Sequence, residues 1–160
     1  MSIKVGDKVP SATLKVMTAD GPASVSTEEL FGKGKAVMFS VPGAFTPTCS
    51  ARHLPGFVDH VDEIRAKGVD RVVCIAVNDV FVMNAWGKSA NVGDKIVMAA
   101  DGNGEFTRAL GLELDARGFG MGQRGQRFAM ITEDGIVKAL DVEAPGEFKV
   151  SSAEHVLGQL

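Results

Sequence analysis

One cysteine lies in a segment whose residue types suit nucleophilic chemistry. The segment runs from Val41 to Ser50 and reads Val-Pro-Gly-Ala-Phe-Thr-Pro-Thr-Cys-Ser. Thr46 is a good N-cap and Pro47 suits the first helical position, so Cys49 falls at the third position of a predicted helix. Free backbone N–H groups and the positive end of the helix dipole favour a thiolate there. The spacing predicts a nucleophilic Cys49, and an ordinary buried cysteine in a capped helix fits the same spacing equally well.

Two neighbours of Cys49 have side chains that would complement such a nucleophile. Thr46 lies three residues earlier in the same turn, where its hydroxyl could face the sulfur or a bound oxygen. Pro42 closes one side of the site without offering a competing hydrogen-bond donor. Together these residue types predict a small site built for an anionic sulfur and an oxygen-containing substrate.

The second cysteine, Cys74, lies in the middle of an apolar run that ends at Val77. At the rise of a strand this places it roughly 10 Å below the edge of the sheet where Cys49 is expected. Because a disulfide needs Cα atoms closer than about 7 Å, a bridge between the two would require local unfolding. We expect Cys74 to be an inert core thiol.

The elements that must position Cys49 follow from alternating strand and helix patterns, which predict an α/β fold with parallel strand–helix–strand pairing. Asp134-Gly135 suits a tight turn, so the last strand should return as a hairpin over 136–140 and make the sheet mixed. Ser151 and Ser152 offer a cap for a closing helical segment. Residues 1–30 are expected to form an extended arm with a turn near Gly21. The predicted strands cover 35–41, 71–77, 95–100 and 127–132, and the predicted helices cover about 47–67, 80–90 and 104–110.

Length and charge exclude several classes of protein. With 160 residues, 45% of them hydrophobic, the chain should fold as one domain over 1–160. The 17 basic against 20 acidic residues give a net charge of −3, which disfavours a nucleic-acid groove or a basic membrane patch. We see no apolar membrane span or signal peptide and expect a cytoplasmic protein. Two cysteines rule out a disulfide scaffold, and the three histidines form no ligand cluster, so no metal site is expected.

The segment Pro42-Gly43-Ala44-Phe45-Thr46-Pro47-Thr48-Cys49 resembles the peroxidatic-cysteine motif of the peroxiredoxins. Its Gly-Ala-Phe form, followed by Ser50-Ala51-Arg52-His53-Leu54-Pro55-Gly56-Phe57, is similar to the type II, peroxiredoxin 5-like branch. The likeness continues through 74–79, 84–86, 127–129 and 151–154, and therefore covers nearly the whole chain. It implies a thioredoxin-like α/β fold, with a mixed central sheet flanked by helices, and thiol-dependent reduction of hydrogen peroxide and organic hydroperoxides. This thiol chemistry needs no metal or organic cofactor, so none is expected.

The resemblance also implies roles for individual residues. Cys49 would be the peroxidatic nucleophile, Thr46 would hydrogen-bond the peroxide, and Pro42 would shield the sulfenate. Arg127, rather than the nearby Arg124, would place a positive charge beside the thiolate, because it directly precedes Phe128 as in the family pattern. Three further residues, together with Met121, are expected to line an apolar entrance or contact the substrate: Thr48, Phe45 and Phe119.

The resemblance leaves the source of electrons open. Animal-like members use a further cysteine near the C-terminus, and the segment 148–152 contains none. The chain therefore resembles plant and bacterial members, whose sulfenic acid would be resolved by an external thiol, either glutathione with glutaredoxin or thioredoxin. A homodimer is expected, as is common in the family. The alternatives are a disulfide oxidoreductase, weakened by the missing Cys-x-x-Cys, and a peroxide-sensing signalling or chaperone-like protein that uses the same cysteine.

Two other features receive ordinary structural interpretations. His53 lies four residues after Cys49 and is expected to be a packing or capping residue rather than a catalytic partner or metal ligand. The stretch Gly120-Met121-Gly122-Gln123-Arg124-Gly125 fits a dinucleotide-binding pattern but leads into a strand instead of a helix. We expect a flexible loop there.

Overall fold

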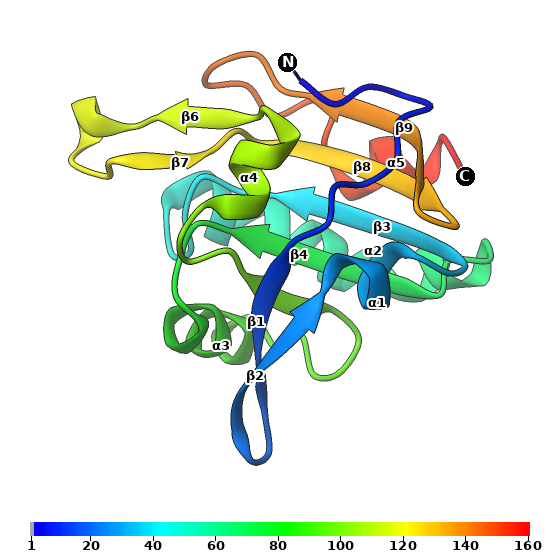
Figure 1. The fold of residues 1–160 in the computed structure, drawn as a ribbon, viewed down its shortest axis with the longest axis horizontal. Coiled ribbons are helices and arrows are strands. Elements are labelled where there is room, and N and C mark those ends of the chain that lie inside the picture. Colours follow the sequence, from blue (N-terminus) through cyan, green and yellow to red (C-terminus); the bar gives the residue numbers. More distant parts are fainter. Residues whose placement is uncertain (1) are drawn as a thin grey trace.

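A seven-stranded mixed sheet forms the centre of the protein in the computed structural model, which describes residues 2–160 (Figure 1). The strand order is β2-β1-β5-β4-β3-β8-β9. Parallel pairing joins β3, β4 and β5, and all other neighbours are antiparallel, which confirms the predicted mixed α/β sheet. The strands are β1 (Thr13–Thr18), β2 (Gly21–Ser26), β3 (Lys35–Ser40), β4 (Arg71–Ala76), β5 (Val97–Ala100), β8 (Phe128–Glu133) and β9 (Ile136–Val142).

Helices cover both faces of the sheet because the central strands are apolar on both sides. Along β3, Val37 and Phe39 belong to the core beneath α2 (Leu54–Ala66), α3 (Val80–Ser89) and α5 (Ala153–Leu157). The alternate residues Ala36 and Met38 belong to the opposite core, with α1 (Thr27–Phe31) and α4 (Glu105–Leu110). The period of two in each strand thus divides the interior into two apolar layers.

The long helix begins with an unusually wide turn. Helical backbone starts at Pro47, but Cys49–His53 form a π-helical turn, η1, in which the Leu54 N–H donates to the Cys49 carbonyl. The next residue, Pro55, has no N–H with which to continue the ordinary ladder. The π-helical turn therefore interrupts the regular helix just before Pro55.

The predicted turn of the last hairpin and the predicted cap of the closing helix are both confirmed. Asp134 and Gly135 both have positive φ angles, 49° and 82°, as a tight turn between β8 and β9 requires. The Ser152 side chain accepts a hydrogen bond from the His155 N–H and caps α5.

None of the helices within residues 2–160 is long and apolar enough to cross a lipid bilayer.

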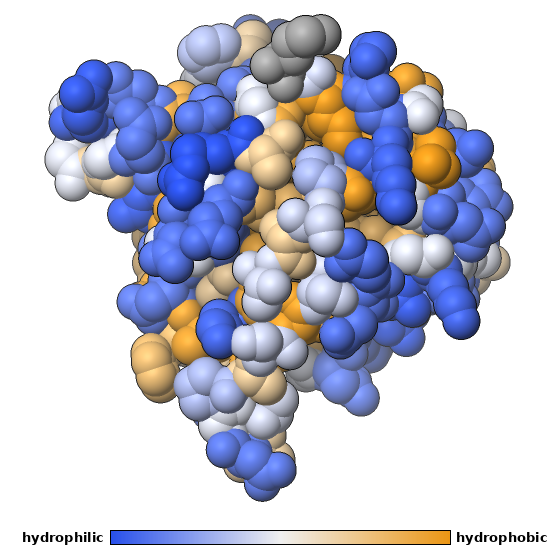
Figure 2. All heavy atoms as spheres, viewed as in Figure 1, coloured by the Kyte–Doolittle hydropathy of each residue, from blue (hydrophilic) through white to orange (hydrophobic). Residues whose placement is uncertain are grey.

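Two segments differ from the sequence predictions. The expected N-terminal arm contains the β1–β2 hairpin at the sheet edge, followed by α1. The expected loop at 120–125 is part of a second hairpin, made of β6 (Glu113–Asp115), the 3-10 turn η2 (Arg117–Phe119) and β7 (Gln123–Gly125). Both hairpins project from the body, and hydrophilic side chains cover their tips (Figures 1 and 2). The strands β6 and β7 have three residues each, too few to show an apolar alternation in the sequence.

Candidate active site

The loop after β3 and the first turns of the long helix hold Cys49 at one edge of the sheet. The Ala44 N–H donates to the Asn78 side chain at 2.9 Å, which ties this loop to the end of β4. The Thr46 carbonyl accepts the Ser50 N–H at 2.9 Å, and the Trp86 indole donates to the Ser50 hydroxyl at 3.0 Å. Cys49 itself has no solvent-exposed surface. The sulfur is therefore fixed at the start of the helix and enclosed by the fold.

The Thr46 hydroxyl has an orientation that its predicted capping role did not indicate. It donates to the Gly43 carbonyl at 2.6 Å, so its proton is committed and its remaining lone pairs can only accept. Gly43 is crowded by the β6–β7 hairpin, since a Cβ there would lie 3.0 Å from the Met121 methyl and 3.2 Å from Arg124 Nη1. A side chain at this position would require the Met121 and Arg124 side chains to shift by a few tenths of an ångström.

Arg127 reaches the sulfur from the neighbouring strand. Because β3 and β8 are antiparallel with Ser40 opposite Phe128, the residue that precedes β8 lies beside the loop that follows β3. Arg127 Nη2 donates to Cys49 Sγ at 3.2 Å. Arg124, the other candidate, instead donates from Nε to the Met121 carbonyl at 2.9 Å. The arrangement pairs a buried sulfur with a permanently charged guanidinium.

His53 connects Arg127 to the C-terminal part of the chain. Arg127 Nη1 lies 2.9 Å from His53 Nδ1, and His53 Nε2 lies 2.8 Å from the Ser151 carbonyl oxygen. A guanidinium only donates and a carbonyl only accepts, so His53 accepts at Nδ1 and donates from Nε2 as a neutral ring. Burial, reinforced by the Arg127 charge, lowers the pKa of His53 to about 3, against the opposing effects of the Ser151 carbonyl and Glu143.

Comparison with known proteins agrees with this geometry. Residues 4–157 match the Redoxin family. The chain is 50% identical to Peroxiredoxin-2E-2, chloroplastic, of Oryza sativa subsp. japonica, over 99% of this chain and 73% of that protein. It is 46% identical to Peroxiredoxin-2B of Arabidopsis thaliana, over 99% of this chain and 98% of the relative. The chain belongs to the peroxiredoxins.

A solved structure of the family extends the likeness to three dimensions. Reduced Prx3 of Vibrio vulnificus in complex with H2O2 is 50% identical, covers 98% of each chain and superposes with a TM-score of 0.94. The match confirms the predicted type II class and the thioredoxin-like α/β fold. Membership also establishes the general activity of this peroxiredoxin as a thiol-dependent peroxidase.

A cavity of about 340 Å³ opens beside Arg127 in this peroxiredoxin. Its mostly apolar walls include Met121 and four of the residues predicted to be catalytic or substrate-binding. Phe45 lies elsewhere: its ring is 6.5 Å from that of Trp86 and it lines a different hollow with Pro55 and Val58. Phe45, whose φ is 64°, therefore lies outside the cavity that holds the other predicted substrate-binding residues. The four residues that meet there are Pro42, Thr48, Phe119 and Arg127.

Cys74 does not line this cavity. It is a free thiol in β4, fully buried between its strand neighbours Phe39 and Met98. Burial raises the pKa of the Cys74 thiol well above its usual value, and the nearby Cys49 acts in the same direction. Within residues 2–160, no three His, Cys, Asp or Glu side chains converge as a metal site.

The contacts of His53 with Arg127 and Ser151 were not predicted from the sequence, where His53 was expected only to pack or to cap a helix. Its spacing of four residues from Cys49 was the available signal, since side chains at that spacing share one helix face. The partners that give His53 its role come from 74 and 98 residues further along the chain.

The buried neutral His53 makes folding stability depend on pH. The unfolded chain binds a proton at this residue near pH 6.5, whereas the folded chain resists it until about pH 3. Stability is therefore complete above pH 6.5 and falls as the pH drops below it, by up to about 1.4 kcal/mol per pH unit. Urea unfolding between pH 7.5 and 5, above the range where most carboxylates titrate, measures this slope.

Two substitutions test whether His53 causes this dependence of stability on pH. We expect His53→Gln to flatten it and His60→Gln, at a partly exposed position on the same helix, to leave it unchanged. A wild-type stability that is independent of pH in this range would contradict a neutral, buried His53.

Proposed function

We propose that Cys49 is the peroxidatic nucleophile with which this peroxiredoxin reduces hydrogen peroxide and organic hydroperoxides. The observation that carries the proposal is the 3.2 Å contact between the Arg127 guanidinium and a buried sulfur at the start of a helix. Thr46, whose hydroxyl proton is held by Gly43, would accept a hydrogen bond from the hydroperoxide O–H. Pro42, at the wall of the cavity, would shield the oxidised sulfur.

In this mechanism the Cys49 thiolate attacks the terminal oxygen of the hydroperoxide. An S–O bond forms as the O–O bond breaks, and the electron pair leaves with the second oxygen as hydroxide or alkoxide, which takes a proton from solvent. Sulfur is oxidised to a sulfenic acid and the peroxide is reduced to water or an alcohol. Arg127 stabilises the negative charge on the sulfur before attack and on the oxygens during it.

An external thiol would return the enzyme to its reduced state. Attack of that thiol on the sulfenic acid releases water and forms a mixed disulfide, which a second thiol then reduces. The proposal is supported by the position of Cys74, buried within β4, and by the presence of only two cysteines in the sequence. Glutathione with glutaredoxin and thioredoxin are both suitable reductants.

Two pairs of substitutions test the assignment. We expect Cys49→Ser to abolish peroxide reduction and Arg127→Gln to slow Cys49 oxidation by about 100-fold, as for the loss of a charge-stabilising donor. Their matched partners, Cys74→Ser and Arg124→Gln, should retain nearly full rates. Stopped-flow oxidation by hydrogen peroxide measures the rates, and intact mass after one equivalent of peroxide identifies the product.

The product separates the two ways of resolving the sulfenic acid. A gain of one oxygen on Cys49 is expected if an external thiol is required. A loss of two hydrogens would mean that Cys74 forms an internal disulfide with Cys49. If Arg124→Gln slowed the oxidation of Cys49 as much as Arg127→Gln does, Arg127 would have no special role.

The apolar cavity next to Arg127 supports organic hydroperoxides as substrates. Leu114, Phe119 and Met121 contribute apolar walls, and a volume of about 340 Å³ can hold an alkyl or aryl group. Such a group would lie in the cavity while its hydroperoxide reaches the sulfur.

Filling this cavity should discriminate between substrates. We expect Ala144→Phe, at the exposed rim, to lower kcat/KM for cumene hydroperoxide much more than for hydrogen peroxide, because only the larger substrate needs the volume. Ala19→Phe, on the exposed turn between β1 and β2, is the control. Equal losses for both peroxides would argue against a substrate pocket.

Two exposed phenyl rings near the cysteine loop support a homodimer. Phe45 and Phe81 are 54% and 64% exposed, and their segments are tied together by the Ala44–Asn78 hydrogen bond. Contact with a second copy of the chain would cover them. In sedimentation velocity we expect a dimer that Phe81→Glu dissociates and that Val5→Glu, at an apolar position 58% exposed, leaves intact; a monomeric wild type would refute the proposal.

A further inference from the structure

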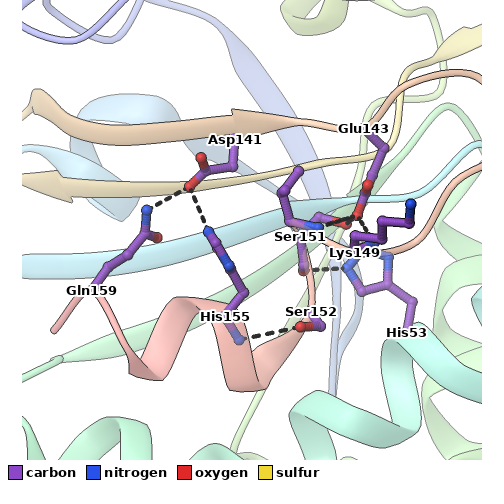
Figure 3. A network of polar contacts seen from close by, with 9 residues as sticks. His53, Asp141, Glu143, Lys149, Ser151, Ser152, His155 and Gln159 are labelled. Atoms are coloured by element: carbon purple, nitrogen blue, oxygen red, sulfur yellow. Dashed lines mark hydrogen bonds and ion pairs between the residues drawn. The ribbon is translucent and has the colours of Figure 1, made fainter.

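One carboxylate outside the cysteine loop holds an irregular segment in place. Glu143 follows β9 directly and is 7% exposed. Its Oε2 accepts hydrogen bonds from the backbone N–H groups of Lys149, Val150 and Ser151 at 2.7, 2.9 and 2.9 Å, and from the Ser151 hydroxyl at 2.7 Å. Figure 3 shows these groups converging on a single oxygen.

The segment 149–151 belongs to no helix or strand. The Glu143 carboxylate therefore accepts the backbone hydrogen bonds that carbonyl groups of a helix or strand would otherwise accept. Burial alone would raise the pKa of Glu143, but the hydrogen bonds from Ser151, Lys149 and Val150 outweigh it and lower the pKa. Glu143 therefore remains ionised throughout the neutral range, and the segment stays fixed.

The fixed segment presents the Ser151 carbonyl to His53. That carbonyl accepts from Nε2 at 2.8 Å, which places the proton of the ring on Nε2 and leaves Nδ1 free to accept from Arg127 at 2.9 Å. The imidazole is enclosed by aromatic rings, with centroids at 5.0 Å for Phe39, 5.6 Å for Phe57 and 4.9 Å for Phe148. It has little freedom to seek other partners.

Three charged groups surround this enclosure. Arg127 and Glu143 act on His53 with opposite signs. The Arg52 guanidinium lies 4.7 Å from the centre of the Phe148 ring, which itself packs against His53. Burial and the Arg127 guanidinium keep the ring neutral, against the opposing effects of the Ser151 carbonyl and Glu143 on its pKa.

We propose that Glu143 is a positioning residue for Cys49: by fixing the Ser151 carbonyl it holds His53 in one tautomer, which orients Arg127 against the sulfur. The inference rests on the proposed peroxidatic role of Cys49. Glu143 does not touch the sulfur; its effect passes through a backbone carbonyl, an imidazole and a guanidinium in sequence. If the carbonyl moves, His53 loses its preference for the Nε2–H tautomer, and Arg127 loses the acceptor that sets its direction.

The test combines a spectroscopic and a kinetic readout on Glu143→Gln. Side-chain 15N NMR of the wild type should show His53 as the neutral Nε2–H tautomer at pH 7. In the variant we expect a neutral ring with mixed tautomers, together with a fall of roughly 10- to 100-fold in the rate of Cys49 oxidation by hydrogen peroxide, as a displaced catalytic group would cause. A purely structural role would lower the melting temperature without changing the tautomer.

Asp141→Asn is the matched control. Asp141 lies in β9, two residues before Glu143, accepts a hydrogen bond from Gln159 at 2.6 Å and lies 3.7 Å from His155, in a cluster separate from His53 in Figure 3. We expect this variant to keep both the tautomer and the rate. Ser151→Ala, which removes the hydroxyl and keeps the carbonyl, should change both readouts in the same direction as Glu143→Gln but less, and it serves if Glu143→Gln does not fold.

Two results would overturn the proposal. One is a mixed His53 tautomer in the wild type, and the other is an unchanged tautomer and oxidation rate in folded Glu143→Gln. Should wild-type Cys49 fail to react with peroxide at all, the proposed function would fall, while the tautomer measurement would still decide whether Glu143 controls His53.

Discussion

A buried sulfur that carries a negative charge needs a fixed positive partner, and in this peroxiredoxin the Arg127 guanidinium lies in that position against Cys49. An unpaired charge without surrounding water is costly, and Cys49 has no contact with solvent. The guanidinium offers donors in a rigid plane, so one nitrogen can face the sulfur while another is held by His53. A lysine would supply the charge but not this two-point attachment.

The sheet supplies the proximity on which that contact depends. Cys49 follows β3, Arg127 precedes β8, and the antiparallel pairing of these strands brings the two chain positions to the same edge. Side chains alternate between the faces of a strand, so a slip of one residue between β3 and β8 would direct Arg127 toward the other apolar layer. Strand register, set by the buried residues of two cores, therefore determines the chemistry at the edge.

The sequence was most informative where a single local pattern determines structure. The central strands follow from continuous apolar runs, the last hairpin from Asp134-Gly135, and the placement of Cys49 at a helix start from Thr46 and Pro47. The polar β6–β7 hairpin carries no such pattern. The hollow that Phe45 lines and the importance of His53 and Glu143 depend on partners that only the tertiary fold brings together. Spacing places a side chain on a helix face, but it does not identify the neighbour across that face.

The order of these residues along the chain has a consequence for synthesis. Cys49 is made first, Arg127 comes 78 residues later, and Ser151 comes 98 residues after His53. Domains generally fold as units during synthesis, and a nascent chain that ends before Arg127 contains the cysteine without its cation. The Cys49 sulfur therefore acquires its charged partner only after the segment through Arg127 has been synthesised and has paired with β3.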